Sequence, residues 1–406
     1  MRILQIDVTC NILSTGKIAE GIGKEILRTG GQSYIAYGRY SLPSRSLSIR
    51  IGSDLSVICH VLLTRILDKH GLGSVRATKQ FLQLVLKIKP DIIHLHEVHG
   101  YYLNYELLFR FLKRYKFPIV WTQHCCWAFT GHCASFDYND CTKWKSLCHD
   151  CQLKREYPAS YFIDNSKQNY LKKKALFTSV ENMQIVAVSR WMESLIRESF
   201  LNKFPIRTIY NGVDTEIFKP TANDIREKYK INDKFLILGV AANWSERKGL
   251  YDFIRLNRYI DRRDTVIMLV GLTKTQIRAL PEGIIGIGRV LDQNVLSKYF
   301  SAADVFFNPT YQEAFGLTNI EALSCGTPVV TYATGGSSET ISDSTGIVSR
   351  KGDLNLAIQA IMKIKRLGKK YYSRACRDRA IKMFKEENSY TKYLDLYQEI
   401  LMKHKG

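Results

Sequence analysis

The sequence predicts an α/β protein with two doubly wound domains, each a parallel sheet covered by helices on both faces. Three observations lead to this prediction. Short apolar runs rich in Val and Ile alternate with helical patterns, and this alternation occurs twice along the chain. The apolar runs are nearly continuous, which is typical of strands buried on both faces of a parallel sheet. The length of 406 residues also exceeds that of one ordinary domain.

The first series contains five expected strands and three helix candidates. Runs of Ile, Leu and Val bounded by turn residues predict the strands, and apolar residues three and four positions apart predict the helices. The strands are expected at 2–9, 33–38, 91–96, 118–124 and 184–189, and the helices at 18–30, 76–89 and 104–116. The last of these helices is basic and amphipathic, so it either lies on anionic lipid or packs with a solvated outer face.

The same pattern restarts in the second half of the chain. Strands are expected at 235–243, 265–271, 304–310 and 327–335, and helices at 249–260, 294–303, 319–326 and 355–368. Pro205 and the turn Asn211-Gly212 interrupt the pattern within 200–214, which places a domain boundary there. We therefore predict one domain at 1–203 and a second at 204–386.

The excess of basic residues favours anionic binding partners. The chain has 59 Lys and Arg against 38 Asp and Glu, a formal charge of +21, which favours nucleic acid, an anionic lipid surface or phosphate-bearing substrates. No stretch reaches the roughly 20 apolar residues of a membrane span, and the N-terminus lacks a signal-peptide pattern. A cytosolic protein is expected, in which clustered cysteines are reduced or metal-bound.

Ligands of doubly wound sheets bind beyond the carboxyl ends of the strands, so residues that follow strands are the candidates. Gly16 follows the first strand, in STGKIAEGIG, and either lets the backbone approach an anion or allows close helix packing. His124 ends the fourth strand. His94, His96 and His99 form H-x-H-x-x-H, which suits either a metal site or neutral polar roles.

The strongest signal is PTYQEAFGLTNIEALSCGTPVV at 309–330. Glu313 lies in the loop after a strand and Glu321 lies inside the next helix, so the two carboxylates can flank one ligand. Backbone N–H groups at the start of a helix bind phosphate. Three residues begin this helix: Gly316, Leu317 and Thr318.

A second phosphate-binding candidate lies in NWSERKGL at 243–250, which follows a strand and opens a helix. Arg247 and Lys248 stand there as fixed cations beside helix N–H groups. Charged residues are common at helix starts, so this stretch predicts a phosphate site only in combination with the stretch 309–330.

The stretch EAFGLTNIE at 313–321 resembles the Glu-x7-Glu motif of glycosyltransferase family 4, the retaining enzymes of the GT-B fold. The resemblance implies two Rossmann-like domains facing a central cleft. Two stretches, 92–106 and 127–151, resemble a bacterial capsule, exopolysaccharide and lipopolysaccharide subgroup with a cysteine-rich insertion at about 125–151. Further stretches that match the family in order extend the resemblance over nearly the whole chain: STGKIAEGIG, WTQHCCW, VSRW, IYNGVD, ERKGL, SCGTPVV and ATGGSSE.

The family resemblance implies a nucleotide-diphospho-sugar donor, bound mainly by the C-terminal domain, and an acceptor bound mainly by the N-terminal one. Lys248 and Arg247 match the residues that bind the donor diphosphate. Glu321 matches the residue that binds the ribose, and Glu313 matches the one that faces the donor sugar. His124 matches the histidine that contacts the sugar or its phosphate.

By the same resemblance, Gly16 is implied to let the N-terminal loop approach the diphosphate or the acceptor.

Two features of the chain differ from the family. Many relatives carry an Arg five or six positions before the diphosphate Lys, but Ala242 and Asn243 stand there, so Arg247 is expected to supply that charge. Cys125 replaces the Asp that usually follows the histidine. The resemblance implies retention of anomeric configuration without a catalytic cofactor or metal, because fixed cations and helix dipoles stabilise the leaving phosphate.

Six of the ten cysteines fall within 124–151. A spacing of C-x7-C-x6-C-x2-C offers four soft ligands that suit a closed structural zinc site. An iron–sulfur cluster, free thiols and disulfides are the alternatives. Cys126, His132 and His149 are reserve ligands. The four proposed ligands are Cys133, Cys141, Cys148 and Cys151.

Charge and cysteines together also suit a zinc-containing basic nucleic-acid-binding protein, but that alternative leaves the Glu pair unexplained. We therefore expect no nucleic-acid partner. The resemblance favours a lipid-linked saccharide acceptor and peripheral attachment to the anionic inner face of the cytoplasmic membrane. It also implies that the last segment, 387–406, is a helix that crosses back onto the N-terminal domain.

Overall fold

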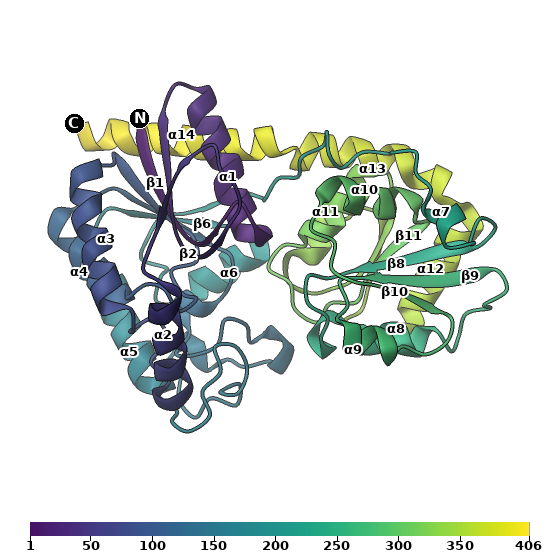
Figure 1. The fold of residues 1–406 in the computed structure, drawn as a ribbon, viewed down its shortest axis with the longest axis horizontal. Helices are drawn as coiled ribbons and strands as arrows, with labels where there is room; N and C mark the ends of the chain where they lie inside the picture. The colour runs from purple at the N-terminus through teal and green to yellow at the C-terminus, as the bar shows by residue number, and fades with distance from the viewer. Residues whose placement is uncertain (406) are drawn as a thin grey trace. The chain divides into compact units, whose positions relative to one another are not determined.

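The computed structural model describes residues 1–405 and divides into two compact units (Figure 1). The first unit contains a seven-stranded sheet in which all neighbouring strands are parallel. In spatial order the strands are β3 (Leu47–Arg50), β2 (Gln32–Ser41), β1 (Arg2–Cys10), β4 (Ile92–Leu95), β5 (Ile119–Gln123), β6 (Met183–Ala187) and β7 (Ile206–Thr208). The strand order reverses between β1 and β4, and this reversal is where ligands of such sheets bind.

The second unit contains a six-stranded parallel sheet. In spatial order the strands are β10 (Ile284–Ile287), β9 (Thr265–Val270), β8 (Phe235–Val240), β11 (Val305–Asn308), β12 (Val329–Tyr332) and β13 (Gly346–Ser349). Its order reverses between β8 and β11. Its helices are α7 (Ile225–Lys228), α8 (Leu250–Leu256), α9 (Lys274–Arg278), α10 (Gln293–Ala302), α11 (Leu317–Ser324), α12 (Leu354–Leu367) and α13 (Lys369–Phe384).

The division between the units follows from strand pairing. The first unit runs from Met1 to Tyr210 and resumes at Ser389, and the second is Asn211–Asn388. The boundary expected at 203/204 precedes β7, and because β7 pairs with β6 this segment belongs to the first sheet. The two units are the two parallel-sheet α/β domains that the sequence predicts.

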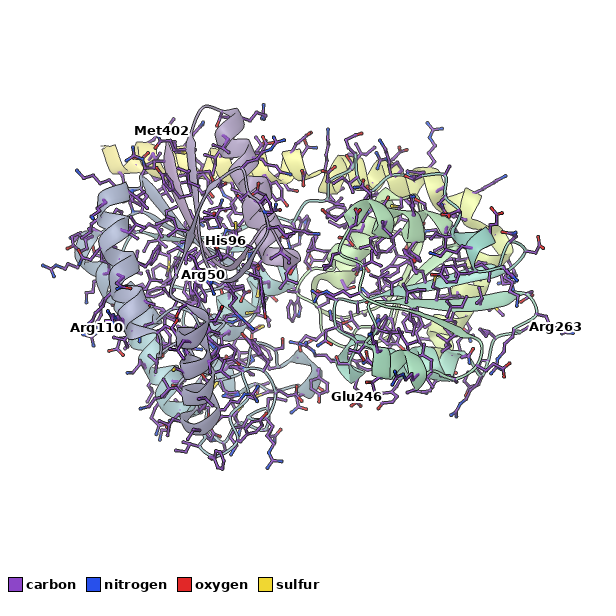
Figure 2. The ribbon with its side chains drawn as sticks, viewed as in Figure 1. Arg50, His96, Arg110, Glu246, Arg263 and Met402 are labelled. Carbon is purple, nitrogen blue, oxygen red and sulfur yellow. The ribbon has the colours of Figure 1, made fainter. Side chains whose placement is uncertain are left out.

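Most helices of the first unit pack apolar residues against the sheet or against one another, whereas α2 (Asp54–Leu67) buries only His60 and Thr64. The helices of this unit are α1 (Leu13–Arg28), α2, α3 (Val75–Ile88), α4 (Tyr105–Tyr115), α5 (Ser166–Phe177), α6 (Arg190–Glu198) and the greater part of α14 (Glu386–Lys405). On α4, Leu108, Phe109 and Leu112 are fully buried, whereas Arg110 projects outward (Figure 2). The basic helix at 104–116 is therefore a packed helix with a solvated face, and its apolar side is not available to lipid.

The helix α14 joins the first sheet through buried polar contacts. The hydroxyl of Tyr397 lies 2.6 Å from Nδ1 of His94, and the hydroxyl of Tyr393 lies 3.2 Å from Oγ1 of Thr122. All four side chains are buried. Among the described helices, none is both long and apolar enough to cross a membrane.

Candidate active site

Two loops at the strand reversal of the second sheet bring a cation and a carboxylate together. Lys248 ends the 3-10 turn η4 (Glu246–Lys248) after β8, and Glu313 lies in the loop after β11. Nζ of Lys248 is 2.6 Å from Oε2 of Glu313, and both side chains are partly exposed, at 28% and 22%. The backbone N–H of Tyr311 donates to the carbonyl of Arg247 at 2.9 Å, which ties the loops a second time. The sequence predicts Lys248 and Glu313 as site residues but not their contact.

Close glycine contacts hold these loops in place. Gly335 has φ +52, and a Cβ there would lie 1.9 Å from the carbonyl oxygen of Glu313. The N–H of the next residue, Gly336, donates to that same carbonyl at 3.0 Å. Gly249 has φ +74, and its Cβ would lie 2.3 Å from the carbonyl oxygen of Pro309. Only glycine fits such positions without moving backbone, so the position of Glu313 depends on them.

The helix α11 begins beside this pair of loops. Gly316 precedes it with φ +101, and no side chain caps its N-terminus in the part of the chain that is described. Leu317 and Thr318 therefore lie in a first turn whose N–H groups have no intrahelical acceptor, and anion binding there stays a prediction. Glu321 follows one turn later and is half-buried. The side chain of Arg247, in the turn before Lys248, is exposed.

A residue that the sequence did not single out, Asn319, fixes the start of α11. Its Oδ1 accepts from Nδ2 of Asn308 at 2.8 Å. Its Nδ2 donates to Oγ of Ser337 at 2.9 Å and to Oγ1 of Thr340 at 3.0 Å. Asn319 is fully buried, so these bonds tie the helix start rigidly to β11 and to the turn η5 (Gly335–Thr340).

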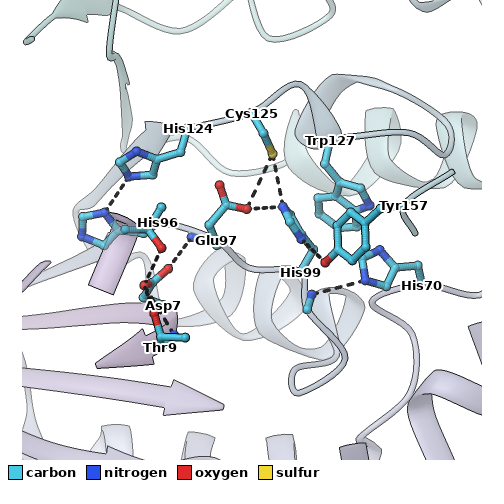
Figure 3. A network of polar contacts seen from close by, with 12 residues as sticks. Asp7, Thr9, His70, His96, Glu97, His99, His124, Cys125, Trp127 and Tyr157 are labelled. Atoms are coloured by element: carbon cyan, nitrogen blue, oxygen red, sulfur yellow. Dashed lines mark hydrogen bonds and ion pairs between the residues drawn. The ribbon is translucent and has the colours of Figure 1, made fainter. Parts of the chain in front are cut away.

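In the first unit, His124 stands at the carboxyl end of β5 in a chain of hydrogen bonds (Figure 3). Its Nε2 lies 3.0 Å from Nδ1 of His96, whose Nε2 lies 3.0 Å from Oε1 of Gln5. Nε2 of Gln5 donates to the carbonyl of Ala19 at 2.8 Å, which leaves Oε1 as an acceptor. His96 therefore carries its proton on Nε2, and His124 donates from Nε2. The lone pair of His124 is on Nδ1.

Burial sets the charge of these histidines. Desolvation lowers the pKa of His124 to about 4, and it holds the pKa of His96 well below its ordinary value. Both rings are neutral near pH 7. His124 then offers an acceptor at Nδ1, which suits a hydroxyl group and does not suit a phosphate oxygen.

A second polar group at this sheet edge was not predicted as a site. Glu97 is the second residue after β4 and forms an ion pair with His99 (Figure 3). Sγ of Cys125 lies 3.2 Å from Nε2 of His99 and 3.6 Å from Oε2 of Glu97. Burial opposes the charged carboxylate, but the charge and hydrogen bond of His99 outweigh it and lower the pKa of Glu97. The only available signal was the position of Glu97 just after a strand.

The contacts of His94, His96 and His99 decide between the two roles expected for the H-x-H-x-x-H motif, a metal site and neutral polar contacts. Glu97, His99 and Cys125 place three potential ligand atoms within 4.8 Å of one another, and the ion pair accounts for this proximity. His94 is engaged elsewhere, with Tyr397 and with Thr122. The three histidines of the motif therefore do not converge on one point, and the neutral polar role describes His94 and His96.

Gly16 lies in the first turn of α1 and is buried. A Cβ there would lie 2.5 Å from Oγ1 of Thr9, so the glycine allows the helix start to press against β1. The preceding Thr15 donates from Oγ1 to Oδ2 of Asp7 at 2.9 Å. Burial, assisted by the charge of Glu97, raises the pKa of Asp7 to about 7. Of the two roles expected for Gly16, close helix packing is visible in these contacts.

The cysteine-rich segment encloses a cavity of about 240 Å³. Cys133 donates to Cys151, a contact that lowers the pKa of the Cys151 thiol. His132 also lines the cavity: Nδ1 contacts Oδ1 of Asp68 at 2.5 Å, and Nε2 is buried without a hydrogen-bond partner among the described residues. The donor chemistry suits zinc, but within residues 1–405 no three of the four proposed sulfurs lie within 4.8 Å of one another. All four line the cavity: Cys133, Cys141, Cys148 and Cys151.

Two family models match the chain. Residues 24–217 match "Glycosyltransferase Family 4", and residues 221–383 match "Glycosyl transferases group 1". The chain is 26% identical over 243 residues to the glycosyl transferase WcaC of Escherichia coli K12, named for colanic acid biosynthesis. It is 28% identical over 214 residues to CapM of Staphylococcus aureus, named as a capsular polysaccharide biosynthesis glycosyltransferase. These matches cover 56% and 48% of this chain and 58% and 54% of the relatives, so the chain spans little more than half their length.

The fold has close structural neighbours. Sucrose-phosphate synthase from Thermosynechococcus elongatus superimposes with a TM-score of 0.73 at 19% identity, covering 99% of both chains. The alternative of a nucleic-acid-binding protein is not supported by these matches. The two family models follow one another along the chain and together span both units. The chain therefore belongs to glycosyltransferase family 4 and has the GT-B fold, as the Glu-x7-Glu motif predicted.

Proposed function

We propose that the protein is a retaining glycosyltransferase that moves a sugar from a nucleotide-diphospho-sugar to an acceptor hydroxyl in the assembly of a bacterial surface polysaccharide. The observation that carries the proposal is the Lys248–Glu313 pair at the strand reversal of the second sheet, next to the uncapped start of α11. The names of the relatives, which refer to colanic acid and capsular polysaccharide, support the pathway.

The second unit would bind the donor. Lys248 leaves Glu313 and binds the diphosphate, with Arg247 as a second cation and the first N–H groups of α11 as fixed dipoles. Glu321 accepts hydrogen bonds from the ribose hydroxyls. Glu313, released from Lys248, accepts hydrogen bonds from the donor sugar. The residues Gly316, Leu317 and Thr318 contribute the helix N–H groups.

The transfer step would use charges that are already in place. As the bond between the anomeric carbon and the phosphate oxygen breaks, negative charge grows on the phosphate, and Lys248 and Arg247 stabilise it without a metal. The acceptor hydroxyl attacks from the same face, and its proton passes to the departing phosphate oxygen. His124 accepts a hydrogen bond from a sugar hydroxyl at Nδ1. Gly16 lets the start of α1 lie near the diphosphate or the acceptor.

We also propose the acceptor and the surroundings of the reaction. A lipid-linked saccharide at the inner face of the cytoplasmic membrane suits the charge of +21. A structural zinc ion bound by the cysteine-rich segment would stabilise the fold of that segment and take no part in the transfer. The ligands are proposed to be Cys133, Cys141, Cys148 and Cys151.

A thermal-shift panel tests the donor site. Wild type, Glu321→Ala and the exposed control Glu282→Ala are heated with UDP, GDP, ADP, CMP and dTDP. A nucleotide at about 100 times its Kd stabilises the folded state by about 2.7 kcal/mol. We expect one nucleotide to stabilise wild type and Glu282→Ala but not Glu321→Ala. Equal stabilisation of all three proteins would remove Glu321 from the site, and stabilisation by short DNA instead would overturn the proposal.

A further inference from the structure

The helix α2 exposes its apolar side to solvent. Leu55, Ile58, Leu62 and Ile66 are 70%, 55%, 53% and 48% exposed. They are spaced three, four and four residues apart, so they form one stripe along the helix. A monomeric soluble protein rarely leaves such a continuous stripe uncovered, because large apolar patches mark interaction sites.

The opposite side of α2 faces the rest of the first unit. His60 and Thr64 are its buried residues. Nε2 of His60 accepts hydrogen bonds from the N–H groups of Gly71 at 3.0 Å and Gly73 at 3.1 Å. The orientation of α2 is therefore fixed by polar contacts to the loop after it, and the helix cannot rotate to bury its aliphatic stripe without breaking them.

A loop far along the chain extends the stripe. Tyr161, Phe162 and Ile163 are exposed, with Phe162 at 73%. The N–H of Tyr161 donates to the carbonyl of Arg65 at 2.8 Å, and its hydroxyl accepts from the guanidinium of that residue. Figure 1 shows α2 on the surface of the first unit, near the loops that follow β5. We name the combined surface the α2 face: Leu55, Ile58, Leu62, Ile66, Tyr161, Phe162 and Ile163.

The charges around the α2 face are mainly basic. Arg65 lies on the Ile58 side of the stripe, and the exposed Lys69 follows the helix. The neighbouring acidic side chains are largely engaged: Asp54 pairs with Arg50, and Asp68 contacts His132. Glu156 is an exposed carboxylate in the loop before Tyr161.

We propose that the α2 face docks the first unit on an anionic lipid bilayer, with the aliphatic stripe and Phe162 in the interface and Arg65 and Lys69 at the headgroups. An apolar helix face with basic neighbours binds such surfaces because apolar side chains are buried among the lipids and cations are attracted to the anionic headgroups. A second copy of the chain fits less well, since a twofold contact would place the two positive rims against each other. The inference rests on the membrane part of the proposed function and identifies the surface that serves it.

Vesicle sedimentation tests this surface. The whole protein is mixed with phosphatidylcholine vesicles that contain either none or about 30% phosphatidylglycerol, at low and high salt. We expect binding to the anionic vesicles that weakens as salt is raised. The variant Leu55→Ser/Leu62→Ser/Phe162→Ser is expected to lose at least about tenfold in partitioning. The control Tyr259→Ser/Leu291→Ser removes exposed apolar side chains of the second unit and is expected to bind like wild type.

A second measurement reports insertion itself. Phe162→Trp places an indole on the α2 face, and brominated lipids should quench its added fluorescence if the residue enters the bilayer. Three results would each overturn the inference. They are a lack of quenching, vesicle binding by the α2-face variant (Leu55→Ser/Leu62→Ser/Phe162→Ser) that equals that of wild type, and no vesicle binding by wild type. A wild-type dimer that the α2-face variant converts to a monomer, without vesicle binding, would assign the face to self-association instead. Nucleotide binding is measured in parallel, so failure of the donor site and failure of the α2 face give separate results.

Discussion

The ammonium group of Lys248 is neutralised by the carboxylate of Glu313, at 2.6 Å in a partly exposed position. A diphosphate that binds Lys248 must displace this partner, so the two carboxyl oxygens of Glu313 compete with phosphate for one cation. The pair thus holds the ammonium group in one orientation, and under the proposed function it would lower the affinity of Lys248 for the nucleoside diphosphate that leaves.

This competition predicts opposite effects of two substitutions. Glu313→Gln frees Lys248 and should strengthen binding of the nucleoside diphosphate up to about fivefold, since such a pair is worth up to about 1 kcal/mol. Lys248→Met should weaken binding about tenfold or more. Titration calorimetry with the stabilising nucleotide measures both, and Lys219→Met, an exposed lysine of the same unit, serves as control. Weaker binding by Glu313→Gln would show that its carboxylate contacts the nucleotide directly.

The glycine contact behind Glu313 predicts a position-specific effect. Gly335→Ala and Gly30→Ala both place a Cβ at positive φ, but nothing lies within 4 Å of Gly30, which follows the end of α1. Gly30→Ala should therefore cost only about 1–2 kcal/mol of unfolding free energy. Gly335→Ala should cost about 1–3 kcal/mol more, because backbone must move, and should also weaken nucleotide binding. Thermal denaturation and nucleotide titration check this, and equal losses in the two variants would contradict it.

His60 predicts a loss of stability in acid. Burial lowers its pKa from 6.5 to about 4, and the two N–H groups donated to Nε2 require the neutral ring. A lowered folded-state pKa gives stability that is complete above pH 6.5 and is lost as the pH falls toward 4. The loss from this group alone should approach about 3 kcal/mol. Urea denaturation of wild type at about pH 7 and about pH 4.5 measures it.

A matched pair of variants isolates the His60 contribution, since other buried histidines titrate in the same direction. His60→Gln should reduce the difference between the two pH values. His404→Gln, an exposed histidine on α14, should leave that difference unchanged. An unchanged difference in His60→Gln would mean that His60 is not the titrating group.

The hydrogen bond between α14 and the first sheet predicts that removing its hydroxyl group lowers the free energy of unfolding. Tyr397→Phe removes the partner of Nδ1 of His94, which is fully buried. Leaving this nitrogen unpaired should cost about 1–3 kcal/mol. Tyr371→Phe, at an exposed position of α13, should change stability by less than about 0.5 kcal/mol. Similar denaturation midpoints for the two variants would contradict the prediction.

Much of the fold was predictable because central strands of parallel sheets are buried on both faces and read as continuous apolar runs. The strands β1, β9 and β11 are of this kind. The edge strand β3 was missed because LSIR is mostly exposed, and β7 was missed because three half-buried residues give no periodic signal. Edge strands lack the pattern that identifies central ones.

The site was predictable one residue at a time. Lys248 and Glu313 follow strands and match a motif, but their contact depends on two loops meeting. The group of Glu97, His99 and Cys125 was missed because it joins the loop after β4 to the loop after β5. Such contacts arise from tertiary geometry that local patterns do not encode.

The return of the chain to its first unit has a consequence for synthesis. A ribosome releases the residues of β1 to β7 long before α14, yet Tyr393 and Tyr397 complete the buried surface around Thr122 and His94. The first unit must therefore wait, incompletely covered, while the whole of the second unit is translated. A stop codon or a frameshift late in the gene would damage the earliest part of the protein to emerge.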